Sequence, residues 1–183
     1  MAWFNPVPFN LVETTNSNDF TMITDYSTSL PIGNHVGAFG TVRKHDVHTG
    51  VDLYVPKGTV VYAVEDGVVV SISRFTGKLV GSGWWLDTDV VMVEGKTGVV
   101  AYGEVLACVG IGERVVAGQP IAVVTPVISK NTPRPKTMLH LELYSHGTTD
   151  WVTHHLGAIR PHNLLDPTPH LRLLASQTSN PQR

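Results

Sequence analysis

Three His-x-x-x-Asp pairs in this chain of 183 residues combine side chains that commonly bind zinc. Chance alone should supply about 0.4 such pairs, so the spacing by itself does not identify a site. Context favours the first pair, because the run GAFGTVR precedes it and β-branched runs follow it, whereas the other two lie in a His-rich, Pro-containing tail. The pairs are His48 with Asp52, His146 with Asp150, and His162 with Asp166.

Seven short motifs follow one another between about Gly37 and Leu171: FG-x-x-R, H-x-G-x-D, GTxVxAxxDGxV, YGE, VxxGERVxAGQPIAxV, LHLEL and LLDPTPHL. Agreement of so many segments in order is far more specific than any one of them. Together they resemble the lysostaphin-type zinc endopeptidases, which cut peptide cross-bridges or stems of bacterial peptidoglycan, and their non-catalytic relatives. The resemblance implies an all-β domain, mainly antiparallel, with a surface groove and an arrangement like a duplicated hybrid motif.

The resemblance also implies a zinc-ligand set. The motif H-x-G-x-D carries two metal ligands over to His48 and Asp52, and the motif H-x-H-F-E carries a third over to His140. The chain departs from the family at both catalytic histidines. Met138 stands at the first histidine of H-x-H, and Glu104 stands where Tyr-x-His-Leu supplies the other.

The chemistry of these residue types supports a hydrolytic site. A catalytic zinc uses three protein ligands, leaves a position for water or substrate, and lowers the pKa of its water toward 7. Glu104 could then act as general base, as a carboxylate does in H-E-x-x-H metalloproteases, or it could be a solvated residue at a strand end. Met138 offers only a weak acceptor and is interpreted as an apolar residue of the core or groove.

Two functions follow from these residues. The first is a zinc-dependent peptidoglycan endopeptidase in which Glu104 replaces the missing histidine. The alternative is a catalytically degenerate relative that binds cell wall or builds a phage tail, since both family histidines are absent from their motif positions. The expected partners are peptidoglycan peptides and, in the second case, other virion proteins.

Strand periodicity indicates how these side chains are positioned. In 137–144, alternation places Met138, His140 and Glu142 on one face, toward the groove, and three leucines on the other, toward the core. Glu142 could be a fourth ligand, a partner for a cation or a partner for an imidazole, and we favour the last. Further strands are expected at 59–64, 67–73, 89–94, 98–105 and 119–124, with hairpin turns at 75–78 and 95–98.

Two loops are expected to border the groove. Trp84 and Trp85 follow a Gly-Ser-Gly run and could stack on sugar or line a peptide channel, although a place at the core edge fits at least one of them equally well. The Pro-containing segment 128–136 precedes the strand of His140 and should form another border. Four further histidines, His45, His146, His154 and His155, are candidates to reach the groove from loops. None of them matches a motif, and like His35, His162 and His170 they are expected to be solvent-exposed loop residues.

Bulk properties indicate one folded domain and exclude several classes. The chain is 42% hydrophobic and 15% charged, which argues against disorder, and its net charge of -2 gives no basis for binding nucleic acid. No apolar run is long enough to span a bilayer. Cys108 is the only cysteine, so an intrachain disulfide and a thiolate zinc site are excluded, and its apolar context predicts a buried, inert thiol.

The expected organisation is a lead-in at 1–36, a lysostaphin-like domain at 37–174 and a polar tail at 175–183. Pro6 and Pro8 interrupt an N-terminal segment that has no basic stretch, so we expect no signal peptide. A wall-acting protein of that kind would have to be delivered in a phage virion, or from synthesis inside the host cell, to the cell wall or periplasm.

Overall fold

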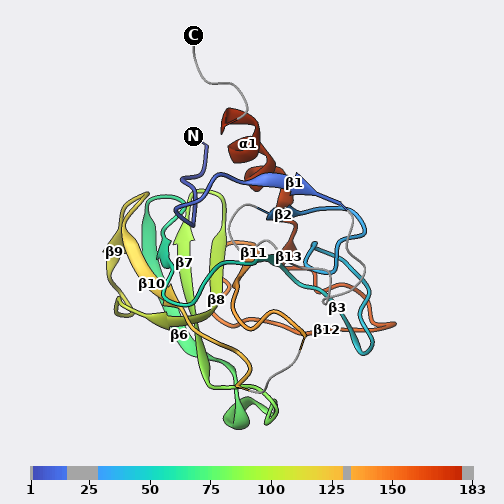
Figure 1. Ribbon diagram of the computed structural model, residues 1–183. Coiled ribbons are helices and arrows are strands. Elements are labelled where there is room, and N and C mark those ends of the chain that lie inside the picture. Colours follow the sequence, from blue (N-terminus) through green and yellow to red (C-terminus); the bar gives the residue numbers. More distant parts are fainter. Residues whose placement is uncertain (1, 16–28, 130–132, 179–183) are drawn as a thin grey trace.

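The computed structural model of the chain describes residues 2–15, 29–129 and 133–178. Within them, nine antiparallel strands form the main sheet, which confirms the expected all-β class (Figure 1). Its path runs β13-β11-β8-β7-β6-β9, with β4 beside β11 and with β10 pairing both β5 and β8. The strands are β4 (Val51–Leu53), β5 (Val60–Tyr62), β6 (Gly67–Thr76), β7 (Thr88–Gly95), β8 (Val99–Ala107), β9 (Arg114–Val115), β10 (Pro120–Val124), β11 (Leu139–Tyr144) and β13 (Leu164–Leu165).

Smaller elements surround this sheet. Strands β1 and β2 form a parallel pair, β3 and β12 form an antiparallel pair, and one short 3-10 helix and one α-helix complete the described chain. No described helix is long and apolar enough to cross a membrane. Their bounds are β1 (Val12–Thr14), β2 (Ser29–Pro31), β3 (Asp46–Val47), η2 (Lys78–Val80), β12 (His154–His155) and α1 (Thr168–Thr178).

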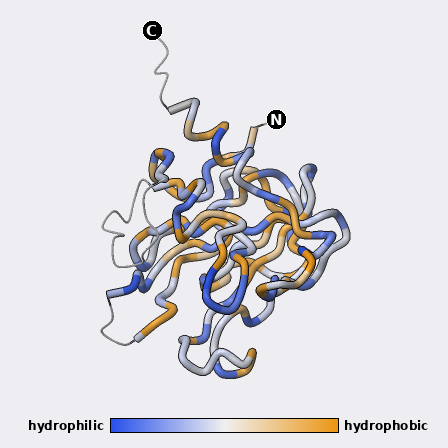
Figure 2. Tube along the Cα trace, turned by 90° about the vertical axis from the view of Figure 1, so that its right-hand side faces the viewer, coloured by the Kyte–Doolittle hydropathy of each residue, from blue (hydrophilic) through white to orange (hydrophobic). Residues whose placement is uncertain are grey.

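The central strands are rich in β-branched residues and are buried, which suits strands covered on both faces. Hydrophobic stretches accordingly run through the interior of the chain trace (Figure 2). The turn between β7 and β8 lies where it is expected, with the Gly95 amide donating to the Gly98 carbonyl over 2.9 Å. Gly98 has a φ of 135° and a side chain there would overlap the carbonyl oxygen of Tyr144, so glycine is required.

The first turn is not the tight hairpin predicted at 75–78. Strand β6 continues to Thr76, and an eleven-residue connection that includes η2 leads to β7 at Thr88. The Thr76 hydroxyl donates to the Leu86 carbonyl over 2.7 Å, and the Leu86 amide donates to the Val127 carbonyl over 2.8 Å. This connection projects from the end of the molecule opposite α1 (Figure 1). Gly77 therefore does mark a turn, but the connection between the two strands is longer than predicted.

The N-terminal segment and α1 share the core of the sheet. Trp3 is buried in the same apolar cluster as strands β4 and β11, and its ring stacks on His170 at a centroid distance of 4.4 Å. Arg172 of α1 forms an ion pair with Glu13 over 2.6 Å. This helix was not predicted from the sequence. Asp166 does supply a signal for its start, since its Oδ1 accepts a hydrogen bond from the Thr168 amide over 2.8 Å. It also extends into the segment expected to be a polar tail at 175–183, and Ala175 is buried.

Cys108 is exposed, so the prediction of a buried thiol was wrong. Strand β8 ends at Ala107, and beyond Val105 only one face of the strand is covered. Leu106 is 58% exposed on the open face. The run of apolar residues in VLACVG therefore does not indicate that all of them are buried at this end of the strand.

Candidate metal centre and pocket

Pairing between β4 and β11 brings the three sequence-predicted ligands together. Asp52 on β4 lies directly opposite His140 on β11 in the antiparallel register. His48 lies in the loop before β4. Its backbone amide donates to the Thr41 carbonyl over 2.9 Å, and this hydrogen bond holds the loop in place. Gly50 permits this approach, because a Cβ there would lie 2.5 Å from the Leu141 carbonyl oxygen and 2.8 Å from His140 Nε2.

The three side chains point one atom each into a small triangle, here called the His–Asp–His cluster. Its edges are 3.1 Å from His48 Nε2 to Asp52 Oδ1, 3.2 Å from His48 Nε2 to His140 Nδ1, and 2.8 Å from His140 Nδ1 to Asp52 Oδ1. Zinc bonds of about 2.0–2.1 Å at tetrahedral angles place neighbouring ligand atoms about 3.3 Å apart. The cluster therefore fits a tetrahedral cation with only small adjustment.

Hydrogen bonds on the outer side of the cluster fix which atoms face inward. His48 Nδ1 lies 2.9 Å from the Ala38 carbonyl oxygen, so this nitrogen donates and leaves Nε2 to the cluster. Arg43 holds Asp52 Oδ2 over 2.7 Å and leaves Oδ1. Glu142 Oε1 lies 3.0 Å from His140 Nε2, behind the imidazole, and none of its atoms belongs to the cluster. Such outer partners orient metal-binding imidazoles and carboxylates.

The charges around the cluster are balanced for a cation. Burial alone would lower the pKa of His140, but hydrogen bonds and charges from Asp52 and Glu142 raise it to about 10. Burial lowers the pKa of His48. Burial opposes ionisation of Asp52, yet the charges of His48 and Arg43 hold its pKa well below the usual value. Without a metal ion, a protonated His140 is thus the cation between two carboxylates, and a bound metal would replace its proton.

Glu104 reaches the same pocket because it sits on a β-bulge. Val105 pairs with Asp89 and Gly103 pairs with Val90, so Glu104 is the extra residue between β7 and β8. Its φ of 63° is the only positive value for a described residue other than glycine. A left-handed conformation of a non-glycine residue costs about 1–3 kcal/mol, and bulges often re-aim a side chain beside a functional site.

The carboxyl group of Glu104 is poorly solvated. The whole residue is 8% exposed, and its Oε2 is buried without a hydrogen-bond partner among the described residues. Burial, followed by the charge of Asp52, raises its pKa to about 8 against the opposing charges of His140 and Arg43. The alternative of a solvated strand-end residue is therefore wrong. A carboxyl group in this state can exchange a proton near neutral pH.

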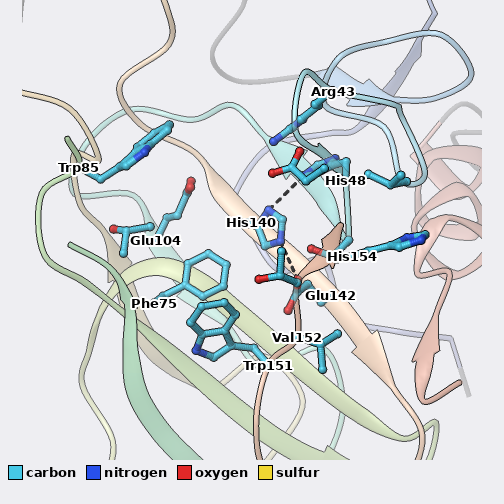
Figure 3. Close-up of a pocket in the computed structure, with 15 residues that line it drawn as sticks. Arg43, His48, Phe75, Trp85, Glu104, His140, Glu142, Trp151, Val152 and His154 are labelled. Carbon is cyan, nitrogen blue, oxygen red and sulfur yellow. Dashed lines mark hydrogen bonds and ion pairs between the residues drawn. The ribbon is translucent and has the colours of Figure 1, made fainter. Parts of the chain in front are cut away.

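Aromatic side chains from distant segments form the pocket walls (Figure 3). Phe75 of β6 lies 5.2 Å from the His140 ring and 5.1 Å from Trp151, between ring centroids. Trp85 lines the pocket as expected, whereas Trp84 is 80% exposed. Phe75 and Trp151 were not predicted, because no motif contains them. Their only sequence signal is that both are aromatic residues beside Gly or polar runs.

A second, smaller hollow adjoins the pocket beside Met138. It shares Arg43, Trp85 and Glu104 with the pocket, and Asp52 of the cluster also borders it. Its remaining border consists of Ile128, Arg134 and Pro135, so the segment 128–136 does border the cleft, apart from 130–132, which lie outside the described residues. Met138 is 6% exposed and contacts a cluster with Tyr54 and Val127, which confirms the apolar interpretation.

The remaining seven histidines divide into four groups. His45, His146, His155 and His162 are exposed, as expected, and none of them lines the pocket. His154 does line it, although its Nε2 is directed at the Ala158 carbonyl oxygen over 3.1 Å. His35 is buried rather than exposed, because its Nδ1 accepts the Gly37 amide over 3.0 Å beside Tyr54. His170 is half-buried rather than exposed, because its ring stacks on Trp3.

Comparison with known protein families gives one match. The profile described as peptidase family M23 matches residues 46–150, more than half of the chain, and this span includes the whole His–Asp–His cluster and Glu104. No curated protein matched the chain.

The chain is also similar to several solved structures. The catalytic domain of lysostaphin from Staphylococcus simulans is 19% identical, with 74% of this chain and 87% of that chain covered and a TM-score of 0.47. The catalytic domain of the prophage-encoded M23 protein EnpA from Enterococcus faecalis is 23% identical, with 65% and 83% covered and a TM-score of 0.47. A zinc-containing peptidase from Vibrio cholerae is 20% identical, with 63% of this chain but only 31% of that chain covered and a TM-score of 0.42.

Proposed function

Because this chain belongs to peptidase family M23, we propose that it is a zinc-dependent hydrolase that cuts peptide bonds in bacterial peptidoglycan. The observation that carries the proposal is the convergence of three ligand atoms, with edges of 2.8–3.2 Å, at the side of a pocket that also contains a buried carboxyl group. Two imidazoles and one carboxylate form a donor set that suits zinc.

In this proposal His48, Asp52 and His140 would hold the metal ion. When bound, zinc polarises a substrate carbonyl and makes hydroxide available at neutral pH. Arg43 keeps Asp52 turned so that one oxygen faces the cluster, and Glu142 keeps His140 turned so that Nδ1 does. Arg43 and Glu142 thus hold the metal ligands in their binding orientation, so the ligands need not rearrange during the reaction.

Glu104 would serve as the general base. It would accept a proton from the attacking water and return it to the departing amine of the cut peptide bond. Its pKa, raised mainly by burial, lies in the range where a carboxyl group can do both. Trp85, Phe75 and Trp151 would hold the peptide and restrict water, as large flat side chains do in ligand pockets.

A second candidate function is a binding or structural role that retains the metal and lacks catalysis. The observation in its favour is Met138, which is buried against Tyr54 and Val127 and provides no donor to a developing oxyanion. Loss of one such donor costs about 10²- to 10³-fold in rate. A phage tail component that binds cell wall would fit this second candidate.

Release of soluble fragments from purified peptidoglycan tests the proposal. The zinc-loaded protein should release fragments, His140→Ala should lose both zinc and release, and Glu104→Gln should keep zinc and lose release. Several wall types should be used, with co-sedimentation measured in parallel. Binding with full zinc content but without release from any wall would refute the hydrolase and favour the second candidate.

A further inference from the structure

One face of β11 carries a continuous line of polar side chains. His140, Glu142 and Tyr144 occupy every second position, so their side chains leave the strand on the same side. The Tyr144 hydroxyl donates to Glu142 Oε2 over 2.7 Å, and Glu142 Oε1 lies 3.0 Å from His140 Nε2. All three are buried, and Glu142 is fully enclosed. The line therefore ends at the His–Asp–His cluster on one side and at a tyrosine on the other.

The same hydroxyl is tied to the pocket wall. Its oxygen accepts the backbone amide of Val152 over 3.1 Å, and Val152 lines the pocket. The neighbouring Trp151 is fixed to β6, because its Nε1 donates to the Arg74 carbonyl over 3.3 Å and its ring lies against Phe75. One hydroxyl group thus joins the wall segment to the carboxylate behind His140.

Glu142 depends on these donors because its side chain is only 1% exposed. Its Oε1 lies 3.0 Å from His140 Nε2, and its Oε2 accepts the Tyr144 hydroxyl over 2.7 Å. A buried carboxylate that loses a donor turns toward another partner, since an unsatisfied buried charge is costly. That rotation would weaken its hold on the His140 ring.

We infer that Tyr144 is a positioning residue that holds Glu142 behind His140 and fastens the wall at Val152 to the candidate metal site. The metal part of this inference rests on the proposed function, whereas the tie to the wall does not. A direct partner of a metal ligand, as Glu142 is of His140, typically changes metal affinity about 10- to 100-fold when it is removed, and Tyr144 acts on His140 through that partner.

Tyr144→Phe removes the hydroxyl and leaves the ring, and Tyr102→Phe is its matched control. Tyr102 is equally buried, and its hydroxyl accepts the Val64 amide over 2.9 Å, away from the pocket. Zinc affinity, measured by competition with a chromophoric chelator, should fall about tenfold or more in Tyr144→Phe and stay within about twofold in Tyr102→Phe. Equal affinity in wild type and Tyr144→Phe, or an equal loss in both variants, would overturn the inference.

A second readout does not need the metal. Amide hydrogen exchange at Val152 in the metal-free protein should accelerate in Tyr144→Phe and remain unchanged in Tyr102→Phe. If the wild-type chain bound no zinc, the proposed function would fail, and this exchange would decide alone. Acceleration confined to Tyr144→Phe would then support the tie, and unchanged exchange at Val152 would overturn it.

Discussion

Replacing Glu104 by Gln should make the metal-free protein more stable at neutral and alkaline pH. The folded-state pKa of Glu104 is about 8, raised from 4.5 chiefly by burial, so the unfolded chain ionises first as pH rises. The contribution of this carboxyl group is therefore most favourable below about pH 4.5 and is lost progressively up to about pH 8. Each pH unit in that window corresponds to about 1.4 kcal/mol, which gives at most about 3 to 4 kcal/mol by pH 7.

Urea unfolding in the presence of a chelator, repeated from about pH 5 to about pH 9, measures this effect. Gln resembles the protonated acid, so the variant should match the wild type near pH 5 and exceed it increasingly above that pH. Comparison of the two proteins cancels most of the pH dependence of the other groups. A stability difference that does not change with pH would refute the buried, weakly acidic Glu104 on which its proposed role as base depends.

Three further predictions follow from single contacts. Gly50→Ala should destabilise the fold by about 1–3 kcal/mol in urea unfolding, because the added Cβ would overlap Leu141 and His140. Gly83→Ala places its Cβ in open space and should leave stability unchanged, so equal effects of the two substitutions would contradict the prediction. Zinc must displace the proton held by His140, so the affinity of the protein for zinc should rise about tenfold per pH unit between about pH 6.5 and 8. A zinc dissociation constant that does not change with pH would contradict binding at His140. Cys108 should react with a thiol reagent in the folded protein, and reaction only in urea would show that it is buried.

The sequence predicted those features that depend on local patterns. The alternation in 137–144 places Leu139 and Leu141 in the core and His140 and Glu142 toward the pocket, as observed. The Gly95 to Gly98 turn also lies where two β-branched runs require one. Assembly of His48, Asp52 and His140 was predicted from motifs in order, and β4–β11 pairing explains why residues so far apart in sequence meet.

Features that depend on tertiary packing could not be predicted in this way. The bulge at Glu104 lies where β8 changes partner, from β11 up to Gly103 to β10 from Val105 onward, and no local signal marks that change. Burial of Trp3 depends on α1 and on the β7–β8 turn, where its Nε1 donates to the Thr97 hydroxyl over 3.1 Å. The apolar residues around Cys108 likewise predicted a buried thiol, whereas Cys108 is exposed.

The proposed function requires that the His–Asp–His cluster binds one metal ion. Zinc content per chain after dialysis, determined by elemental analysis, should be compared between the wild type and His48→Ala, with His146→Ala as a control on an exposed histidine. We expect one zinc ion per chain in the wild type and in His146→Ala, and none in His48→Ala. Absence of zinc from the wild type, or equal zinc content in all three proteins, would contradict the account.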